Sequence, residues 1–539
     1  MQGISVLAEA VLFAFFVSPI EMRKLEKLQI IKNVGSSWFA LAANVLVGFF
    51  LSPYILHRLG DTAFGIWVLI FAITGYYGLF DLGIRSSIVR YISKAKATGD
   101  LQYASRIIST SLFSYTCIGA FSLLLTIVVS VYIRTLFHIP EQFHSTASSL
   151  LLMVGTAVSL GFPLGVSGGV LEGLQEFGIL NWTSIISTVA RAILIILSLR
   201  NGHGLLMVAA ITVTLPVVTS IIRSVIAARL LPAPFGLQYV NRASFREIAG
   251  YSSASLIMIV SARLRFKTDS VIIGSFLSAV AITYFNIGSR IVDYAGEVVD
   301  SLAQIFVPMS SHSDALGDMD RLRKIFVAGN RFCAFTIFPI CVVLVILGKS
   351  VIEAWVGVKY VATSYPVLLI LLLSTTLMLA QAASGRVLMG MSKHRTWAMV
   401  TLIEGLVNIG LSVALVRPFG IVGDAIGTAV PLAVTTICFL PWHLCRQLQI
   451  RITTYLREAY FLPLIVCIPL VVALLLMKQW FVPHNYIQLA AHLGVAGTIY
   501  GLTLSWAFAS KRAMKVGTLH SPEGLEPAIA SIESFSQEI

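Results

Sequence analysis

Long apolar blocks recur along the 539-residue chain and are separated by short stretches that carry most of its charged residues. A helix needs about 20 apolar residues to cross a bilayer, and the blocks match this length. The pattern predicts fourteen transmembrane helices, near 35–56, 64–84, 108–133, 147–169, 178–198, 205–230, 248–274, 280–309, 326–348, 364–390, 396–416, 423–445, 458–477 and 486–509. The predicted fold class is therefore an all-α polytopic membrane protein.

Short motifs recur in the two halves of the chain at the same place relative to the apolar blocks. The stretch ATGD at 97–100 matches ALGD at 315–318, and SGGVLEG at 167–173 matches SGRVLMG at 384–390. Six predicted spans separate the copies, so both copies have the same orientation in the membrane. Parallel repeats of this kind are typical of transporters that bind substrate between two lobes near the midplane.

The repeat predicts how the chain divides. We expect two pseudo-symmetric lobes of six helices each, at 35–232 and 246–446, followed by two additional helices within 458–509. Residues 1–34 are expected to form a cytoplasmic or interfacial N-terminal segment. The polar stretch 510–539 is expected to be a disordered cytoplasmic tail.

Composition and charge agree with a membrane protein. The chain is 57% hydrophobic and only 12% charged, whereas soluble domains carry about 25% charged residues. Its net charge of +13 could suggest a nucleic-acid partner. However, if the spans alternate, 22 of the 38 Lys and Arg residues fall in segments on the side of the two termini and 7 in segments on the other side. This asymmetry predicts that both termini are cytoplasmic, and it accounts for the basic charge without nucleic acid.

Motifs for chemistry are missing from the sequence. It contains no GxxxxGK[ST] loop for nucleotide binding, no evident nucleophile and base pair, and no cysteine or histidine spacing typical of a metal site. We therefore predict that the protein is not an enzyme, with no catalytic residues, no metal and no cofactor.

Two stretches resemble a known family of transporters. Residues 32–93, which contain LGDTAFGIW and DLGIR, and residues 263–294 are similar to the polysaccharide biosynthesis (O-antigen flippase) family of the multidrug, oligosaccharidyl-lipid and polysaccharide exporter superfamily. The resemblance implies the fold that multidrug exporters and lipid II flippases share. It also implies a bacterial inner-membrane protein that moves undecaprenyl-diphosphate-linked oligosaccharide to the outer leaflet by alternating access. A polysaccharide polymerase is then a candidate partner.

Ionisable residues inside predicted spans are costly, so they are the best functional candidates. The eighth span contains four of them, namely Arg290, Asp293, Glu297 and Asp300. At about 100° per residue they fall within roughly 80° of the helix circumference. Arg290 is expected near the midplane, where it would bind the diphosphate. The three carboxylates are expected to bind a coupling ion, either H⁺ or Na⁺.

Other basic residues extend the expected substrate site. Arg263 and Lys267 are four residues apart in the seventh span and share one face, and Arg191 lies in the fifth span. The planar guanidinium of arginine donates two hydrogen bonds to phosphate oxygens. We therefore assign Arg290, Arg263, Lys267 and Arg191 to substrate binding.

Two further pairs are expected to neutralise each other and pin helices together. Asp81 and Arg85 are four residues apart near the end of the second span, and so are Arg265 and Asp269 in the seventh.

Other functions remain open at this point. A cation-coupled multidrug exporter or a lipid II flippase would have the same fold, so fold alone does not decide the substrate. A multidrug cavity should be acidic and apolar, whereas here basic residues lie in spans of both lobes. A non-transporting scaffold of a polysaccharide assembly complex would have no hydrated cavity for the charged face of the eighth span.

Overall fold

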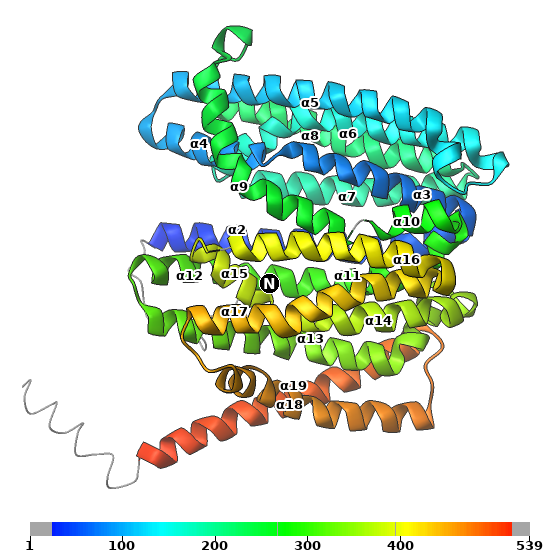
Figure 1. Cartoon of the computed structure of the whole chain (residues 1–539), viewed down its shortest axis with the longest axis vertical. Helices are drawn as coiled ribbons and strands as arrows, with labels where there is room; N and C mark the ends of the chain where they lie inside the picture. Colours follow the sequence, from blue (N-terminus) through cyan, green and yellow to red (C-terminus); the bar gives the residue numbers. More distant parts are fainter. Residues whose placement is uncertain (1–23, 267, 394, 520–539) are drawn as a thin grey trace, which may run out of the picture. The chain divides into compact units, whose positions relative to one another are not determined.

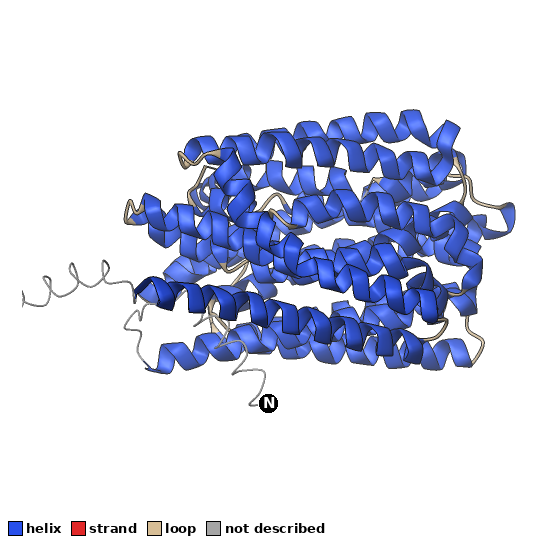
Figure 2. Cartoon of the chain, turned by 90° about the horizontal axis from the view of Figure 1, so that it is seen from below, coloured by secondary structure: helices blue, strands red, loops and turns tan. Residues whose placement is uncertain are grey.

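A computed structural model describes residues 24–266, 268–393 and 395–519. This part of the chain is folded into helices joined by short loops, and it contains no strand (Figure 2). Eleven of its helices are long and apolar enough to cross a membrane. The predicted all-α polytopic class is confirmed.

The eleven helices account for twelve of the fourteen predicted spans. The long helix Arg395–Gln447 covers two of them, because the backbone leaves the helical conformation at Gly420. The other two predicted spans correspond to the α9 and α10 segment and to α11, which form as helices but carry more charged residues than an ordinary apolar span.

Contacts divide the chain into two compact units, which we describe separately. Figure 1 labels their helices. Unit 1 comprises residues 1–286 and 398–428. Its helices are α2 (Lys24–Leu59), α3 (Asp61–Gly75), α4 (Ile84–Thr98), α5 (Leu101–Leu136), α6 (His144–Gly173), α7 (Phe177–Arg200), α8 (Leu205–Leu230), α9 (Arg242–Phe266), α10 (Asp269–Phe276), the start of α11 (Ala279–Ala303) and the middle of α16 (Arg395–Val434). Short 3-10 turns lie at Tyr76–Asp81 (η1), Glu141–Phe143 (η2) and Leu237–Tyr239 (η3).

Unit 2 comprises residues 287–397 and 429–539. It contains the rest of α11 and α16, α12 (Phe306–Ala315), α13 (Met319–Val356), η4 (Val358–Tyr360), α14 (Val361–Leu379), α15 (Ala382–Gly390), the π-helical turn η5 (Thr435–Phe439), α17 (Leu440–Gln447), α18 (Ile452–Trp480) and α19 (Tyr486–Leu519). This division follows contacts rather than the sequence repeat, so the two six-helix lobes stay a prediction.

Both ends of the chain differ in extent from the predicted segments. Helix α2 begins at Lys24, inside the expected N-terminal segment 1–34, and α19 continues to Leu519, inside the expected tail 510–539. Residues 1–23 and 520–539 lie outside the described residues.

The repeated stretches ATGD (97–100) and ALGD (315–318) form the same turn. Gly99 and Gly317 both have a left-handed backbone, with φ of 69° and 68°. The aspartate that follows each glycine caps the next long helix. Asp100 accepts a hydrogen bond from the Tyr103 N–H at 2.8 Å, and Asp318 accepts one from the Arg321 N–H at 2.9 Å. A side-chain acceptor at this position satisfies a backbone N–H of the first helical turn.

The second repeated motif is also used in the same way in both copies. The last residue of the motif is Gly173 in the first copy and Gly390 in the second. A Cβ added to Gly173 would lie 2.9 Å from Ile92 of α4, and a Cβ added to Gly390 would lie 2.7 Å from Ser310 of α12. Each glycine therefore lets the end of its helix closely approach a neighbouring helix. Close helix packing is therefore a feature that the two copies of the motif share.

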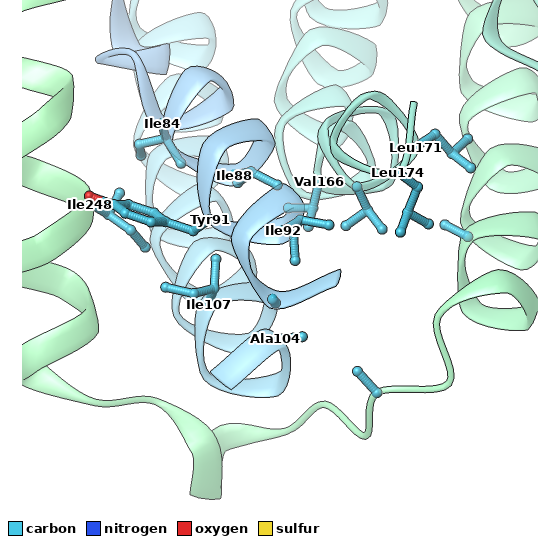
Figure 3. Close-up of a cluster of buried hydrophobic side chains, with 14 of the residues drawn as sticks. Ile84, Ile88, Tyr91, Ile92, Ala104, Ile107, Val166, Leu171, Leu174 and Ile248 are labelled. Carbon is cyan, nitrogen blue, oxygen red and sulfur yellow. The ribbon is translucent and has the colours of Figure 1, made fainter. Parts of the chain in front are cut away.

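Helix α4 is held in unit 1 by one apolar face. Ile84, Ile88 and Ile92 are spaced four residues apart and are buried against α5 and α6. Figure 3 shows this cluster, with Ile107 of α5 and Leu171 of α6 among its members. Arg85, which directly follows Ile84, is not part of this apolar cluster.

In unit 2, a proline in α13 creates a docking point for α19. Pro339 has no N–H, so the carbonyl of Phe335, four residues earlier, cannot be satisfied within the helix. The Tyr500 hydroxyl of α19 donates to that carbonyl at 2.6 Å. Helix α19, the second of the two helices outside the repeat, is thus attached to α13 by a specific polar contact.

Candidate functional site

The charged face of α11 forms one local group in unit 2. The Arg290 guanidinium lies 3.7 Å from Asp293 and 3.6 Å from Glu297, and it stacks over the Tyr294 ring at 4.5 Å. The Arg290 side chain is 34% exposed. Both distances are too long for a close hydrogen bond, so the guanidinium is balanced by charge but is not locked to either carboxylate.

Asp300 takes part in a different ion pair. Its carboxylate accepts a hydrogen bond from Arg386 of α15 at 3.2 Å. The Arg386 Nε is buried and has no acceptor among the described residues. Arg386 is a functional candidate that the sequence did not reveal, although it stands in SGRVLMG where the other copy of the motif has Gly169.

Arg263 lies against the interruption of the second span, in unit 1. Helix α3 ends at Gly75 and continues as the 3-10 turn η1, which contains Gly78. A Cβ on Gly78 would be 2.8 Å from the Arg263 guanidinium nitrogen. Arg263 forms no ion pair with a carboxylate of the described chain. Lys267, its predicted neighbour on the same face, lies outside the described residues.

Arg191 is an uncompensated cation in α7. Its Nε is buried without an acceptor, and no carboxylate of the described residues pairs with it. One helical turn earlier, the Thr188 hydroxyl donates to Asn44 of α2 at 2.8 Å. An unpaired guanidinium inside a span is costly, so this position is suited to an anionic ligand.

Arg265 forms a buried ion pair that the sequence did not predict. Its Nε lies 2.5 Å from Glu404 of α16, and the two side chains are 9% and 1% exposed. The pair is possible because the helices approach closely at Gly405, where a Cβ would lie 3.0 Å from Leu264. A charge that is neutralised inside the protein is a poor candidate for substrate binding.

The expected pair of Asp81 and Arg85 is wrong. Arg85 of α4 instead binds Glu172 of α6 through two hydrogen bonds of 2.7 and 3.2 Å. Asp81 accepts a hydrogen bond from Tyr115 of α5. The reason is that Leu82 and Gly83, both with positive φ, end the helix between the two residues, so they are not on successive turns of one helix.

A buried acidic cluster is the most unusual polar group in unit 1, and we define it as Asp269, Asn408, Ser412, Asp424 and Thr428. Asp424 is fully buried, and neither carboxyl oxygen has a hydrogen-bond partner among the described residues. The neighbouring Ser412 hydroxyl donates to the Asp424 main-chain carbonyl instead, at 3.3 Å. Asp269 of α10 is 9% exposed and lies near enough for its charge to repel that of Asp424.

Side-chain hydrogen bonds connect the other members of the buried acidic cluster. Thr428 donates to Asp269 at 2.9 Å and lies 3.2 Å from the Asn408 amide nitrogen, which donates to it. The Ser412 hydroxyl also lies 3.2 Å from the Asn408 side-chain oxygen, so its single hydrogen is shared between this oxygen and the Asp424 carbonyl. The cluster therefore places the amide of Asn408 and the hydroxyls of Ser412 and Thr428 beside two buried carboxyl groups inside a span.

Glycines in α16 bring the cluster together. Gly420 has φ 58° and ψ −143°, so the helix bends back on itself at this residue. Beyond the bend, a Cβ on Gly423 would lie 2.1 Å from the Leu415 carbonyl, and one on Gly427 would lie 2.4 Å from the Ser412 hydroxyl. Because Gly423 and Gly427 have no side chains, the part of α16 after Gly420 can touch the part before it, which places Ser412 beside Gly427.

The basic and acidic groups have different chemical uses. Arg290, Arg191 and Arg263 offer guanidinium groups that are not held in close ion pairs, which suits phosphate oxygens. Two carboxylates in a dehydrated site cannot both stay charged without a proton or a cation between them. The buried acidic cluster is thus suited to a proton or to a hard monovalent cation with oxygen ligands.

Comparisons with known proteins identify the family of the chain. The family described as "Polysaccharide biosynthesis protein" matches residues 30–313. The "Putative O-antigen transporter" of Shigella flexneri is 21% identical over 428 residues, which cover 78% of this chain and 99% of the relative. The "Probable low-salt glycan biosynthesis flippase" of Haloferax volcanii is 23% identical over 395 residues, covering 71% and 77%.

Solved structures of two kinds of transporter share the fold. The lipid II flippase MurJ in an inward closed conformation has a TM-score of 0.68 at 14% identity, and the match covers 89% of this chain and 99% of that one. An inward-facing multidrug transporter of the MATE family, in the MOP superfamily, has a TM-score of 0.64 at 14% identity, covering 77% and 95%. At such low identity the likeness shows the fold alone.

Proposed function

Since the chain belongs to the polysaccharide biosynthesis protein family, we propose that it is a flippase for oligosaccharides linked to a polyprenyl diphosphate. It is a multi-pass membrane protein with the fold of the multidrug, oligosaccharidyl-lipid and polysaccharide exporter superfamily. The names of its relatives in Shigella and Haloferax support movement of a glycan carrier from the cytoplasmic to the outer leaflet. The cell membrane of the bacterium is the proposed location, with both termini cytoplasmic.

The observation that supports a diphosphate substrate is the state of the basic residues inside the spans. Arg290, Arg191 and Arg263 each present a guanidinium that no close carboxylate hydrogen bond occupies within the described chain. A diphosphate carries several acceptor oxygens, and one guanidinium fork can donate two parallel hydrogen bonds to a pair of them. Lys267 is proposed as a further contact on the face of Arg263.

The carboxylates beside Arg290 have a place in this mechanism. Asp293 and Glu297 lie 3.7 and 3.6 Å from the guanidinium, so they compete with a phosphate for it. Such competition weakens binding, which permits the substrate to leave on the far side of the membrane. Tyr294 keeps the guanidinium in position by stacking beneath it.

Coupling to an ion gradient is proposed to use the buried acidic cluster rather than the α11 carboxylates. Asp293 and Glu297 are 45% and 37% exposed and already face Arg290. Asp424, in contrast, is buried, its carboxylate has no hydrogen-bond donor among the described residues, and it is repelled by Asp269. A proton or a monovalent cation bound there would remove this repulsion, so its entry and exit would change the stability of the α16 bend.

A cation-coupled multidrug exporter is the second candidate. It is favoured by the likeness to the MATE fold and by the three carboxylates on α11. Cationic drugs would need Asp293 and Glu297 to be released from Arg290. This requirement makes the exporter the weaker candidate.

Reconstitution tests the proposed function. Purified protein in proteoliposomes should move a polyprenyl-diphosphate oligosaccharide between leaflets, measured as the fraction of labelled glycan that an external glycosidase removes. The same vesicles should not accumulate ethidium. Transport of ethidium without movement of the glycan lipid would replace the proposal with the multidrug exporter.

A further inference from the structure

An open pocket of about 610 Å³ lies in unit 1, apart from the groups described above. It is formed where α2 ends and α3 begins, at the start of α6, and at the turn from α7 to α8. In the predicted topology this end of unit 1 faces the outside of the cell. The basic groups proposed for transport are not among its lining residues.

The polar side of the pocket is positive. Arg58, in the last turn of α2, makes no hydrogen bond or ion pair within the described chain, and its guanidinium only stacks over Tyr54 at 5.7 Å. His203 lies in the α7–α8 turn with Nδ1 3.2 Å from the Ser198 carbonyl, so Nε2 can face a ligand. Within the part of the chain that the structure describes, no acidic residue lines the pocket.

Two further features suit an anionic amphiphile. The backbone N–H groups of Leu205 and Leu206 begin the 26-residue helix α8 and have no acceptor among the described residues. They add the positive end of a helix dipole to Arg58. The rest of the lining is largely apolar and includes Phe143 and Met207, which could contact a hydrocarbon chain.

We propose that this pocket binds the phosphate group of an amphiphilic lipid whose headgroup carries a net negative charge. Arg58 donates a guanidinium fork to the phosphate oxygens, and His203 and the start of α8 contact the same group from the other side. Two lipids have this chemistry, namely an anionic phospholipid of the membrane and the polyprenyl diphosphate carrier. The second possibility rests on the proposed function, because the carrier would arrive here only after translocation.

Photo-crosslinking tests the proposal with the full chain in phosphatidylcholine nanodiscs. Benzoylphenylalanine in place of Phe143 should crosslink radiolabelled phosphatidylglycerol or polyprenyl diphosphate, added at a few mole percent, but not radiolabelled phosphatidylcholine. In Arg58→Ala, the lipid fraction that gives half-maximal crosslinking should rise about tenfold, because charge-assisted contacts to phosphate are lost. The matched control is Arg200→Ala, which removes a cation at the same end of unit 1 but outside the pocket lining.

Each outcome decides a different question. Labelling by phosphatidylglycerol alone assigns the pocket to a membrane lipid, and labelling by the diphosphate alone assigns it to the carrier. Equal labelling by phosphatidylcholine, or an Arg58→Ala titration that matches wild type, would overturn the proposal. Glycan translocation is measured separately, so loss of the flippase function would leave the result for phosphatidylglycerol intact.

Discussion

Arg265 and Glu404 form an ion pair of 2.5 Å in which both side chains are almost completely buried. Such a pair contributes little when intact, but breaking it leaves one charge without a partner. We predict that Glu404→Gln destabilises the protein by about 3–5 kcal/mol, since Arg265 keeps its charge in a dry site. The measurement is the midpoint temperature of thermal aggregation in detergent, and the protein that remains soluble is detected by fluorescent size-exclusion chromatography.

The matched control is the exposed pair of Arg323 and Asp320, which are three residues apart on α13. Asp320→Asn should change stability by less than about 1 kcal/mol. If Glu404→Gln were as mild as this control, Arg265 would have another anion to balance it, and the pair would not hold α9 against α16.

Gly78 positions a predicted substrate residue. A Cβ at this glycine would meet the end of the flexible Arg263 side chain at 2.8 Å, so Gly78→Ala should displace the guanidinium without unfolding the span. We expect glycan translocation to fall about tenfold, as for the loss of a charge-assisted hydrogen bond. Expression and thermal stability should stay near the wild-type values.

Gly75→Ala is a close control for this change. It lies one turn earlier in the same span, and a Cβ there would have nothing within 4 Å. Equal translocation by the two alanine variants would mean that the position of Arg263 does not matter to the substrate.

Arg290 should be required for translocation rather than for folding. We predict that Arg290→Ala lowers the rate of glycan flipping by at least about tenfold, because a phosphate loses a guanidinium contact. Arg290→Lys should restore only part of the rate, since an ammonium cannot form the two-pronged contact. Proteoliposome flipping at matched protein amounts checks both variants.

A surface arginine serves as the control for Arg290. Arg321 is at the start of α13 and takes no part in the α11 group. Its alanine variant should flip at the wild-type rate. Wild-type flipping by Arg290→Ala would remove this residue from the substrate site.

Much of the fold could be predicted because it depends on local rules. Apolar blocks of membrane-spanning length predicted the helices, and the two GD motifs mark helix starts because glycine adopts positive φ and aspartate caps the next N–H. The proximity of Arg290, Asp293 and Glu297 follows from one helical face. Each of these statements needs only residues that are close in sequence.

Contacts between distant segments could not be predicted in the same way. The partner of Arg265 is 139 positions further along the chain, and that of Arg85 is 87 positions away. In the sequence, Asp424 is the second residue of the predicted span 423–445, and none of its neighbours in sequence indicates that it is buried. Only the bend at Gly420 and the close approach at Gly427 show that it lies inside the protein beside Ser412.

The buried acidic cluster leads to a prediction about ion coupling. If a proton or a monovalent cation neutralises Asp424 and Asp269, an amide at position 424 should mimic the neutral state permanently. Asp424→Asn should therefore still bind the glycan lipid but lose the dependence of flipping on an imposed proton or sodium gradient, and Asp269→Asn should behave similarly. Asp293→Asn is the matched control, because it removes a carboxylate from the α11 group while leaving the buried cluster unchanged, and its flipping should still respond to the gradient. The assay is flipping in proteoliposomes with each gradient applied in turn and collapsed by an ionophore. A wild-type response by Asp424→Asn would exclude the cluster as the coupling site, and loss of the response in Asp293→Asn instead would assign coupling to α11.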